Sequence, residues 1–250
     1  MLWGRYASNA REARYPHLWA GRVFGVCPSV QGPAGLNVYD LSGGAKHATL
    51  NNMDAPTDWV RANGRYALDM DGSNDFVQFP SVTTSGQQTV SIHVSLSKAG
   101  IIVGGGNNTY AFYTDGLTSG GRIYYSVSNS FVSVIHGGLA SQWAHLAVVR
   151  NGTSIQFFKN GVQLGATQTL GAGVGSQSLF YVGREGGGYH SSMQWDDLAI
   201  YNRALTTGEI RLLARRRSIA YEARRDIVFG LSGFSAYWAR RQNQIIGGGV

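Results

Sequence analysis

Two Asn-Gly dipeptides constrain the fold of this chain more than any other feature. Asn151-Gly152 lies between the apolar run of residues 144–150 and the segment 154–159, and Asn160-Gly161 follows that segment. Asn-Gly between such runs favours a type I′ hairpin, because both residues tolerate positive φ. Two successive hairpins predict a three-stranded antiparallel meander and therefore an antiparallel sandwich. The alternation of the middle strand places Ile155 and Phe157 on one face and Gln156 and Phe158 on the other.

Further strands are predicted before the meander. Residues 89–97 alternate between apolar and polar side chains, so we expect one face of that strand in the core and the other in water. Residues 101–106, 111–113, 122–127 and 131–135 are also rich in strand-forming residues. The apolar residues of 18–26 predict the first strand, with Trp19, Val23 and Phe24 as core candidates.

Two helices are predicted, one at each end of the strand-rich region. Residues 8–14 have the composition of a short surface helix that Pro16 would end. Thr206 and Glu209 have the spacing of a capping box, and Leu205 and Ile210 that of a hydrophobic staple. A second helix therefore begins at Thr206, and the arginines that follow it suit its C-terminal end.

Composition excludes several classes of protein. The 250 residues include 35 Gly and only 14% charged residues, which suits strands joined by tight turns. Cys27 is the single cysteine, so no disulfide can form within the chain, and we expect a small buried thiol. The sequence contains no apolar run typical of a signal peptide or a membrane helix, which predicts folding in a cytosol without membrane insertion.

The net charge of +7 is concentrated near the C-terminus, where residues 214–250 contain seven Arg and two acidic residues. A basic segment can bind nucleic acid. Apolar residues interrupt this one repeatedly, however, so the sequence disfavours nucleic acid as a partner.

Four segments in order carry a family resemblance. In chain order they are residues 39–50, 67–77 and 143–149, followed by the strand-to-helix stretch from Tyr181 to Ile210. The centre of that last stretch is Trp195-Asp-Asp-Leu-Ala-Ile-Tyr201. From about Arg22 to Leu213 the chain resembles the laminin-G-like branch of the concanavalin A-like lectin/glucanase superfamily. The resemblance implies an all-β antiparallel jelly roll over residues 22–213 with a short C-terminal exit helix. Residues 1–21 and 214–250 would then be extended terminal arms.

The resemblance brings enzymes into consideration, since the superfamily includes glucanases. Hydrolysis of a glycosidic bond needs two carboxyl groups about 5 to 10 Å apart. The chain contains no Glu-x-Asp-x-x-Glu strand, and the adjacent Asp196 and Asp197 would point to opposite faces of a regular strand. We therefore expect no enzymatic activity.

A structural Ca²⁺ is the cofactor that the resemblance implies. Its matching ligand is Asp196, with Asp71 and Asp75 of the Asp-Gly-Ser-Asn-Asp turn as further candidates. The alternative is a turn in which Asp71 and Asn74 bond local amides. The six histidines lack the spacing of a transition-metal site, and His145 is expected to be a packed or edge residue.

Sugar binding is the remaining chemistry. Lectin sites combine an aromatic face with amide, hydroxyl or carboxylate groups. Two Gly-rich loops contain these groups, although ordinary turns contain them too. The candidate carbohydrate-binding residues are Asn107, Asn108, Tyr110, Tyr189 and His190.

The C-terminal segment is too apolar for a solvated tail. We expect it to serve in assembly, through Phe229, Phe234, Tyr237, Trp238, Arg240 and Arg241. With its two ends, the chain resembles laminin-G-containing open reading frames of tailed bacteriophages.

That resemblance implies a virion structural or decoration protein on the capsid surface or tail, assembled in the host cytoplasm. Its expected partners are other virion proteins, further copies of itself and glycans. A free bacterial lectin is the alternative, and a glycoside hydrolase suits the sequence less well.

Overall fold

A computed structural model describes residues 6–106, 111–128, 130–171 and 175–224. The chain divides into two compact units, one of residues 21–219 and the other of residues 1–20 with 220–250. None of the helices in the described ranges has the length and apolar character needed to cross a membrane.

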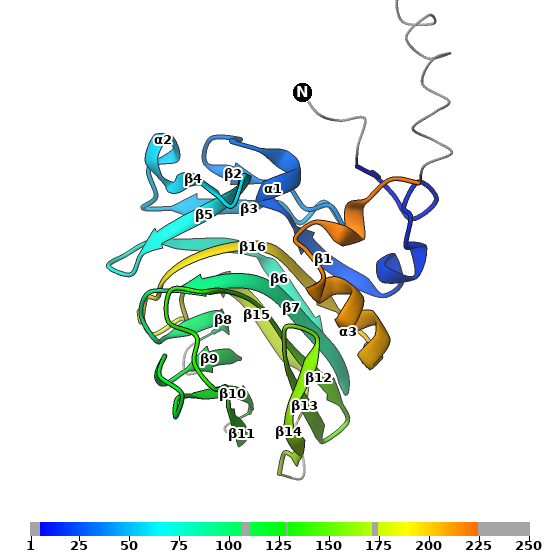
Figure 1. Ribbon diagram of the computed structural model, residues 1–250, viewed down its shortest axis with the longest axis vertical. Coiled ribbons are helices and arrows are strands. Elements are labelled where there is room, and N and C mark those ends of the chain that lie inside the picture. Colours follow the sequence, from blue (N-terminus) through cyan, green and yellow to red (C-terminus); the bar gives the residue numbers. More distant parts are fainter. Residues whose placement is uncertain (1–5, 107–110, 129, 172–174, 225–250) are drawn as a thin grey trace, which may run out of the picture. The chain divides into compact units, whose positions relative to one another are not determined.

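The larger unit is a sandwich of two antiparallel sheets (Figure 1). The first sheet has the order β14-β13-β12-β7-β16-β5-β4, and β1 pairs with β16 beside this path. Its strands are β1 (Arg22–Val26), β4 (Trp59–Ala62), β5 (Arg65–Asp71), β7 (Gln87–Leu96), β12 (Trp143–Asn151), β13 (Ser154–Lys159), β14 (Val162–Thr169) and β16 (Ser192–Tyr201).

The second sheet has the order β11-β10-β9-β8-β15-β6-β3-β2. Its strands are β2 (Asn37–Val38), β3 (Ala48–Asn51), β6 (Phe76–Thr84), β8 (Ile101–Gly105), β9 (Phe112–Thr114), β10 (Arg122–Val127), β11 (Ser130–Ile135) and β15 (Gln177–Val182). Short helices are α1 (Pro28–Gln31), α2 (Ala55–Asp58) and α3 (Thr207–Ala214), with 3-10 turns at Pro16–Trp19 and Ile219–Tyr221. This architecture confirms the predicted jelly roll and exit helix.

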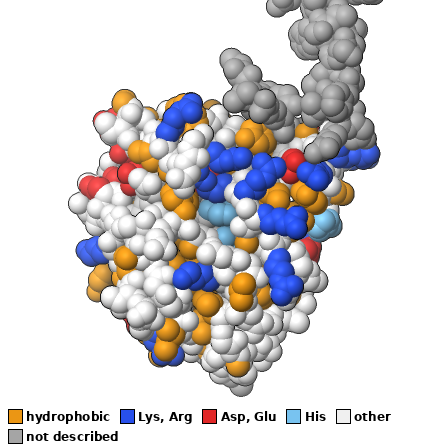
Figure 2. Space-filling view, in the orientation of Figure 1, with side chains coloured by type: hydrophobic (Ala, Val, Ile, Leu, Met, Phe, Trp, Pro, Cys, Tyr) orange, Lys and Arg blue, Asp and Glu red, His pale blue; other side chains and the backbone are white. Residues whose placement is uncertain are grey.

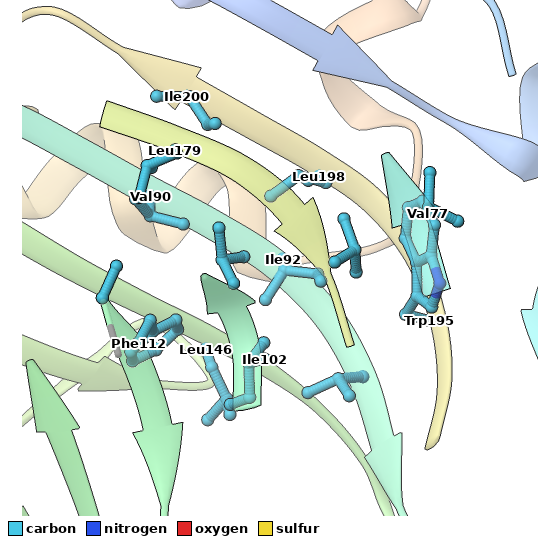
Figure 3. Packing of buried hydrophobic residues seen from close by; sticks show 14 of the residues in the cluster. Val77, Val90, Ile92, Ile102, Phe112, Leu146, Leu179, Trp195, Leu198 and Ile200 are labelled. Atoms are coloured by element: carbon cyan, nitrogen blue, oxygen red, sulfur yellow. The ribbon is translucent and has the colours of Figure 1, made fainter. Parts of the chain in front are cut away.

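One continuous hydrophobic core fills the space between the sheets (Figure 3). The first sheet contributes Val90, Ile92, Leu146, Trp195 and Leu198, among others, and the second contributes Val77, Ile102, Phe112 and Leu179. All of these side chains are buried. Full burial of such a side chain contributes about 1.5 to 3 kcal/mol each, so this core is the main source of stability.

The predicted meander of β12, β13 and β14 is confirmed, but one of its turns differs. Asn160 and Gly161 both have positive φ between the paired residues Lys159 and Val162, as in a type I′ turn. In the first hairpin Asn151 pairs with Ser154, so the central residues are Gly152 and Thr153. Of these two, only Gly152 has positive φ, and the predicted type I′ turn at Asn151-Gly152 is therefore wrong.

The prediction that one face of β7 lies in water is also wrong. Its polar residues Thr89, Ser91, His93 and Ser95 are all buried, although they face away from the core. Helix α3 packs against β7, β12 and β14 on this outer side of the sheet. The segment just before α3 covers Thr89, whose hydroxyl donates to the carbonyl of Arg203 and accepts from the amide of Leu205. The segment from Arg203 through α3, which is distant in sequence, thus covers the face of β7 that was expected to contact water.

Helix α3 has the predicted N-terminal cap. The Thr206 hydroxyl accepts from the Glu209 amide, and the Glu209 carboxylate accepts from the Thr206 amide. Arg203 forms a 2.6 Å ion pair with the same carboxylate. Leu205 and Ile210 are both buried, as the predicted staple requires.

In the smaller unit, the predicted helix over residues 8–14 is wrong. The side chain of Asn9 accepts from the amides of Arg11 and Glu12, and Glu12 accepts from the amide and hydroxyl of Ser8. These local bonds hold a turn instead, because they compete with helical backbone bonds. The first strand likewise begins at Arg22, after the 3-10 turn that contains Trp19.

The two ends of the described chain pair with each other in this smaller unit. Tyr6 and Ala13 form isolated antiparallel bridges with Glu222 and Ala223. The Trp19 indole donates to the carbonyl of Ala220 over 2.8 Å. Residues 220–224 of the predicted C-terminal arm thus pair with the predicted N-terminal arm. The six predicted assembly residues, from Phe229 to Arg241, lie outside the described residues.

Candidate functional site

A surface pocket of about 300 Å³ lies where the segment leading into β8, the end of β9 and the loop before β16 meet. It brings together aromatic, hydroxyl, amine and imidazole groups. The residues that line it are Lys98, Ala99, Gly100, Ile101, Tyr113, Thr114, Tyr189 and His190.

The aromatic part of this pocket consists of Tyr113 and Tyr189. Tyr189 is 66% exposed and is among the most exposed large side chains that the structure describes. Tyr113 is half-buried, and its ring stacks on that of Tyr124 with 4.7 Å between centroids and 9° between planes. Tyr124 is itself held by a 2.7 Å hydrogen bond from its hydroxyl to Asp115. The pocket therefore has one anchored ring and one ring presented to solvent.

The polar part of the pocket comes from three chain segments. Thr114 is buried, and its hydroxyl accepts from the Gly100 amide over 3.3 Å while its own amide donates to the Gly100 carbonyl. These bonds fix the end of β9 against the segment before β8. His190 lies 3.3 Å, at Nδ1, from the carbonyl oxygen of Asp75, which orients the imidazole. Lys98 is exposed and adds a positive charge.

The structure thus places two predicted carbohydrate-binding residues, Tyr189 and His190, in one pocket. Asn107, Asn108 and Tyr110 lie outside the described residues. Lys98, Tyr113 and Thr114 were not predicted from the sequence as partners of Tyr189. The signal for Tyr113 was its place in a predicted strand, and a strand pattern does not show which loop lies beside the strand.

Asp196 and Asp197 do not point to opposite faces of β16, and that expectation is wrong. The pairing of β16 with β7 shifts between Asp196 and Ala199, and Asp197 has a φ of 54°. This bulge inserts a residue in a left-handed conformation, which re-aims the side chains. Both carboxyl groups are consequently buried in one polar cluster.

The surroundings of Asp196 do not suit a Ca²⁺ ligand. Its Oδ1 accepts from the amides of Ser29 and Asp197 and from the Cys27 thiol, and Arg217 Nε lies 3.6 Å from its Oδ2. Burial raises the pKa of Asp196 above its usual value. A carboxyl group that is buried beside a guanidinium group already has its counter-ion, and the same guanidinium repels a metal cation. Cys27 is buried as expected, with a raised pKa caused first by that burial.

Asp71 and Asp75, the other predicted calcium ligands, lie in the turn after β5. Asp75 accepts from the Asp71 amide over 3.1 Å, and Asp71 accepts from the Ser73 amide over 2.7 Å. Asp71 pairs with Ser192 in the sheet, four residues before Asp196 on β16, which corresponds to roughly 13 Å. The structure therefore does not bring Asp196 together with these two residues. Within the described ranges, no cluster of three or more His, Cys, Asp or Glu side chains has a metal-binding arrangement.

Two histidines lie beside the Asp pair, on the outer face of the sheet. His145 on β12 is fully packed, with its Nε2 2.9 Å from the Ser91 hydroxyl, as expected for a packed residue. Burial lowers the pKa of His145 to about 3. His93 on β7 lies with Nδ1 3.9 Å from Asp197 Oδ2, and its pKa is also well below the usual value, first because of burial. Both rings are therefore neutral at physiological pH.

Comparison with known proteins gives a family match. Residues 71–211, more than half of the chain, match Laminin_G_3, which is described as the concanavalin A-like lectin/glucanases superfamily. No curated protein matches the chain.

Solved structures share the fold at low sequence identity. Domain 4 of AbnA, an extracellular GH43 arabinanase from Geobacillus stearothermophilus solved with arabinotriose, is 16% identical with a TM-score of 0.58, covering 78% of this chain and 98% of that one. The binding domain of Paraclostridial Mosquitocidal Protein 1 is 16% identical with a TM-score of 0.59, and the match covers 79% of this chain and 52% of that one. Trypanosoma rangeli sialidase is 17% identical with a TM-score of 0.57, and the match covers 78% of this chain and 32% of that one. The chain thus spans nearly all of the first structure, about half of the second and a third of the last.

Proposed function

We propose a function on the premise that this chain belongs to the concanavalin A-like lectin/glucanases superfamily, as the match over residues 71–211 shows. The domain is lectin-like. Our proposal is that it binds a glycan, without cleaving it, in the pocket between Tyr113 and Tyr189.

One observation carries the proposal: an exposed tyrosine ring stands at the rim of a pocket that also contains polar groups. The face of Tyr189, which is 66% exposed, offers an apolar surface for one side of a sugar ring. Lys98, Thr114 and His190 line the same pocket of about 300 Å³ and offer polar groups for sugar hydroxyls. An apolar wall with a few polar groups is the usual composition of a small-ligand site.

The positions of the paired carboxyl groups support binding without hydrolysis. A glycosidase needs its two carboxyl groups beside the bond that is cleaved. Asp196 and Asp197 are buried under Arg217 and Ser218, where a glycan cannot reach them. The arabinanase domain solved with arabinotriose provides a fold precedent for a sugar complex, in a domain that the match covers to 98%. At 16% identity it does not indicate which sugar this chain binds.

A glycan array tests the proposal. We expect full-length protein to bind a defined set of glycans and the Tyr189→Ala variant to lose about tenfold or more in affinity, because the stacking surface is gone. Tyr39→Ala is the matched control, since Tyr39 is 48% exposed and does not line the pocket. Equal binding by wild type and Tyr189→Ala, or no binding to any glycan, would contradict the proposal.

The same array, repeated with a calcium chelator, tests the remaining metal candidates. Because Asp196 does not suit Ca²⁺, a calcium effect would have to come from the turn that contains Asp71 and Asp75. These two residues neighbour the pocket through His190, which contacts the Asp75 carbonyl. Chelator-sensitive binding that Asp71→Asn also weakens would assign the metal to this turn.

The second part of the proposal concerns the particle to which the domain is attached. We propose that the chain is a decoration or structural protein of a tailed-phage virion, on the capsid surface or tail, with the glycan pocket facing outward. The likeness of the chain ends to phage reading frames and the basic, aromatic composition of residues 225–250 support this. The alternative is a free bacterial lectin, for which a neighbouring capsid or tail gene would be unexpected.

Sedimentation of virus particles tests whether the chain is attached to them. We expect the full chain to sediment with particles from a producing culture, and a chain lacking residues 225–250 to stay in the soluble fraction. The cut is placed after Arg224 because residues 218–223 make described contacts, such as the bond from the Ser218 amide to Asp197. A full chain that is absent from particles favours the free lectin.

A further inference from the structure

A second pocket, of about 250 Å³, lies on the outer face of the first sheet. The end of α3 and the arginines after it form one wall, and Asn63 and Arg65 at the β4–β5 turn form another. His93 and His145 lie in its floor. None of its lining residues belongs to the pocket that contains Tyr189. In Figure 2, histidine side chains are visible in a recess flanked by Lys and Arg side chains.

The charge around this pocket is positive. Arg65, Arg215, Arg216 and Arg217 line it, and none of its lining residues is acidic. Two carboxyl groups lie next to its lining residues: Asp196 is 3.6 Å from Arg217 Nε and Asp197 is 3.9 Å from His93 Nδ1. Four guanidinium groups against two carboxyl groups leave a balance of at least +2. This balance favours an anion, because guanidinium groups bind phosphate and carboxylate oxygens in bidentate geometry.

The floor of the pocket contains polar atoms without a hydrogen-bond partner. Both ring nitrogens of His93, Nδ1 of His145 and Nη1 of Arg217 are buried and unpaired among the described residues. Buried polar groups in folded proteins almost always have a partner, so such a cluster needs an explanation. A neutral imidazole still has one N–H donor, and an oxyanion in the pocket would supply acceptors for the donors on the floor.

Two further observations favour a prepared site. Arg217 lies over the ring of Trp143 at 4.4 Å, donates to the carbonyl of Ala62 and is only 7% exposed, so its orientation is fixed. Arg65 donates to the Ser218 hydroxyl over 2.7 Å, which fixes the opposite wall. Arg215 and Arg216 are exposed at the mouth of the pocket. A metal cation is disfavoured here because four arginines would repel it.

We propose that this pocket binds a tetrahedral oxyanion, a phosphate or sulfate group, with Arg215 and Arg216 at the entrance and Arg217, His93 and His145 beneath it. The volume exceeds that of a single phosphate, so it also accommodates part of a molecule that bears the group. This second site is independent of the glycan pocket.

Calorimetric titration of the full-length protein tests this site. The probes are inorganic phosphate, inorganic sulfate, a sugar monophosphate and a sulfated monosaccharide, all at constant ionic strength set with NaCl. We expect saturable 1:1 binding of at least one probe and a loss of affinity of tenfold or more in Arg215→Gln/Arg216→Gln. Because both side chains are exposed, this variant is expected to fold normally, and its thermal unfolding confirms that.

Arg211→Gln is the matched control. Arg211 is an exposed arginine of α3 that does not line the pocket, and its loss should change affinity less than twofold. Binding of an ester but not of the free ions would identify the ligand as an ester, and the reverse would identify a free ion. The single variant Arg215→Gln is measured beside Arg211→Gln. A non-saturable response, or a loss in Arg211→Gln as large as that in Arg215→Gln, would show general charge attraction and overturn the proposal. Tyr189→Ala should leave oxyanion binding unchanged.

Discussion

Replacing Arg217 with Met is expected to lower the free energy of unfolding by about 3 kcal/mol at pH 8. Met keeps the apolar stem of the side chain but removes the guanidinium, which lies 3.6 Å from Asp196 and over the ring of Trp143. Breaking a buried pair leaves an uncompensated charge, whose burial costs several kcal/mol. The loss should be smaller at pH 5, because the raised pKa of Asp196 lets that carboxyl take up a proton.

Two further variants make this prediction specific. The double variant Asp196→Asn/Arg217→Met should be more stable than Arg217→Met alone, since no charge is then left unpaired. Arg215→Met, which changes an exposed arginine two residues away, should alter stability by less than about 0.5 kcal/mol. Urea unfolding measures all three. Strictly additive effects in the double variant would mean that Arg217 and Asp196 do not stabilise each other.

Replacing Asp197 with Asn should stabilise the protein at high pH but not at low pH. Burial and the neighbouring Asp196 raise the pKa of Asp197 from 3.8 to about 7. A carboxyl group with a raised pKa contributes its stability below pH 4, and this stability is lost as the pH rises through 7. About three pKa units at about 1.4 kcal/mol each set an upper limit of roughly 4 kcal/mol for that loss.

We therefore expect Asp197→Asn to exceed wild type by roughly 2 to 4 kcal/mol at pH 8 and by less than about 0.5 kcal/mol at pH 3.5. Asn suits the left-handed backbone at this position, where φ is 54°, and its amide oxygen can still accept from the Ser218 amide. His93 and His145, whose lowered pKa values weaken the fold in acid, are present in both proteins, so the difference isolates Asp197. A stability difference that is the same at both pH values would contradict the account of this carboxyl group.

Local sequence signals predicted local structure well. Asn160-Gly161 forms the type I′ turn, and Thr206 with Glu209 forms the capping box, because the partners of each signal lie within a few residues. The ordered family motifs predicted the jelly roll because each motif covers neighbouring elements of the chain, such as the end of β5, the turn after it and the start of β6 in residues 67–77. The helix predicted over residues 8–14 failed even locally, because side-chain bonds of Asn9 and Glu12 hold a turn.

Features that depend on distant segments were not predictable. The outer face of β7 looked solvent-facing from its alternation, yet α3 and the arginines after it cover that face. The bulge at Asp197 turns two neighbouring carboxyl groups into one buried cluster, and no spacing rule signals a bulge. At the pocket proposed to bind glycan, Tyr189 and His190 were predicted as site residues from their loop composition, and they line the same pocket. Their partner Tyr113 was not, because only the folded sheet brings β9 beside that loop.

The most direct test of the central claim is a crystal structure of the full-length protein with the strongest glycan from the array. We expect a sugar ring packed against Tyr189 in the pocket next to Tyr113, with sugar hydroxyls within hydrogen-bond distance of Lys98, Thr114 or His190. A glycan bound elsewhere, with these residues uncovered, would contradict the assignment of the site.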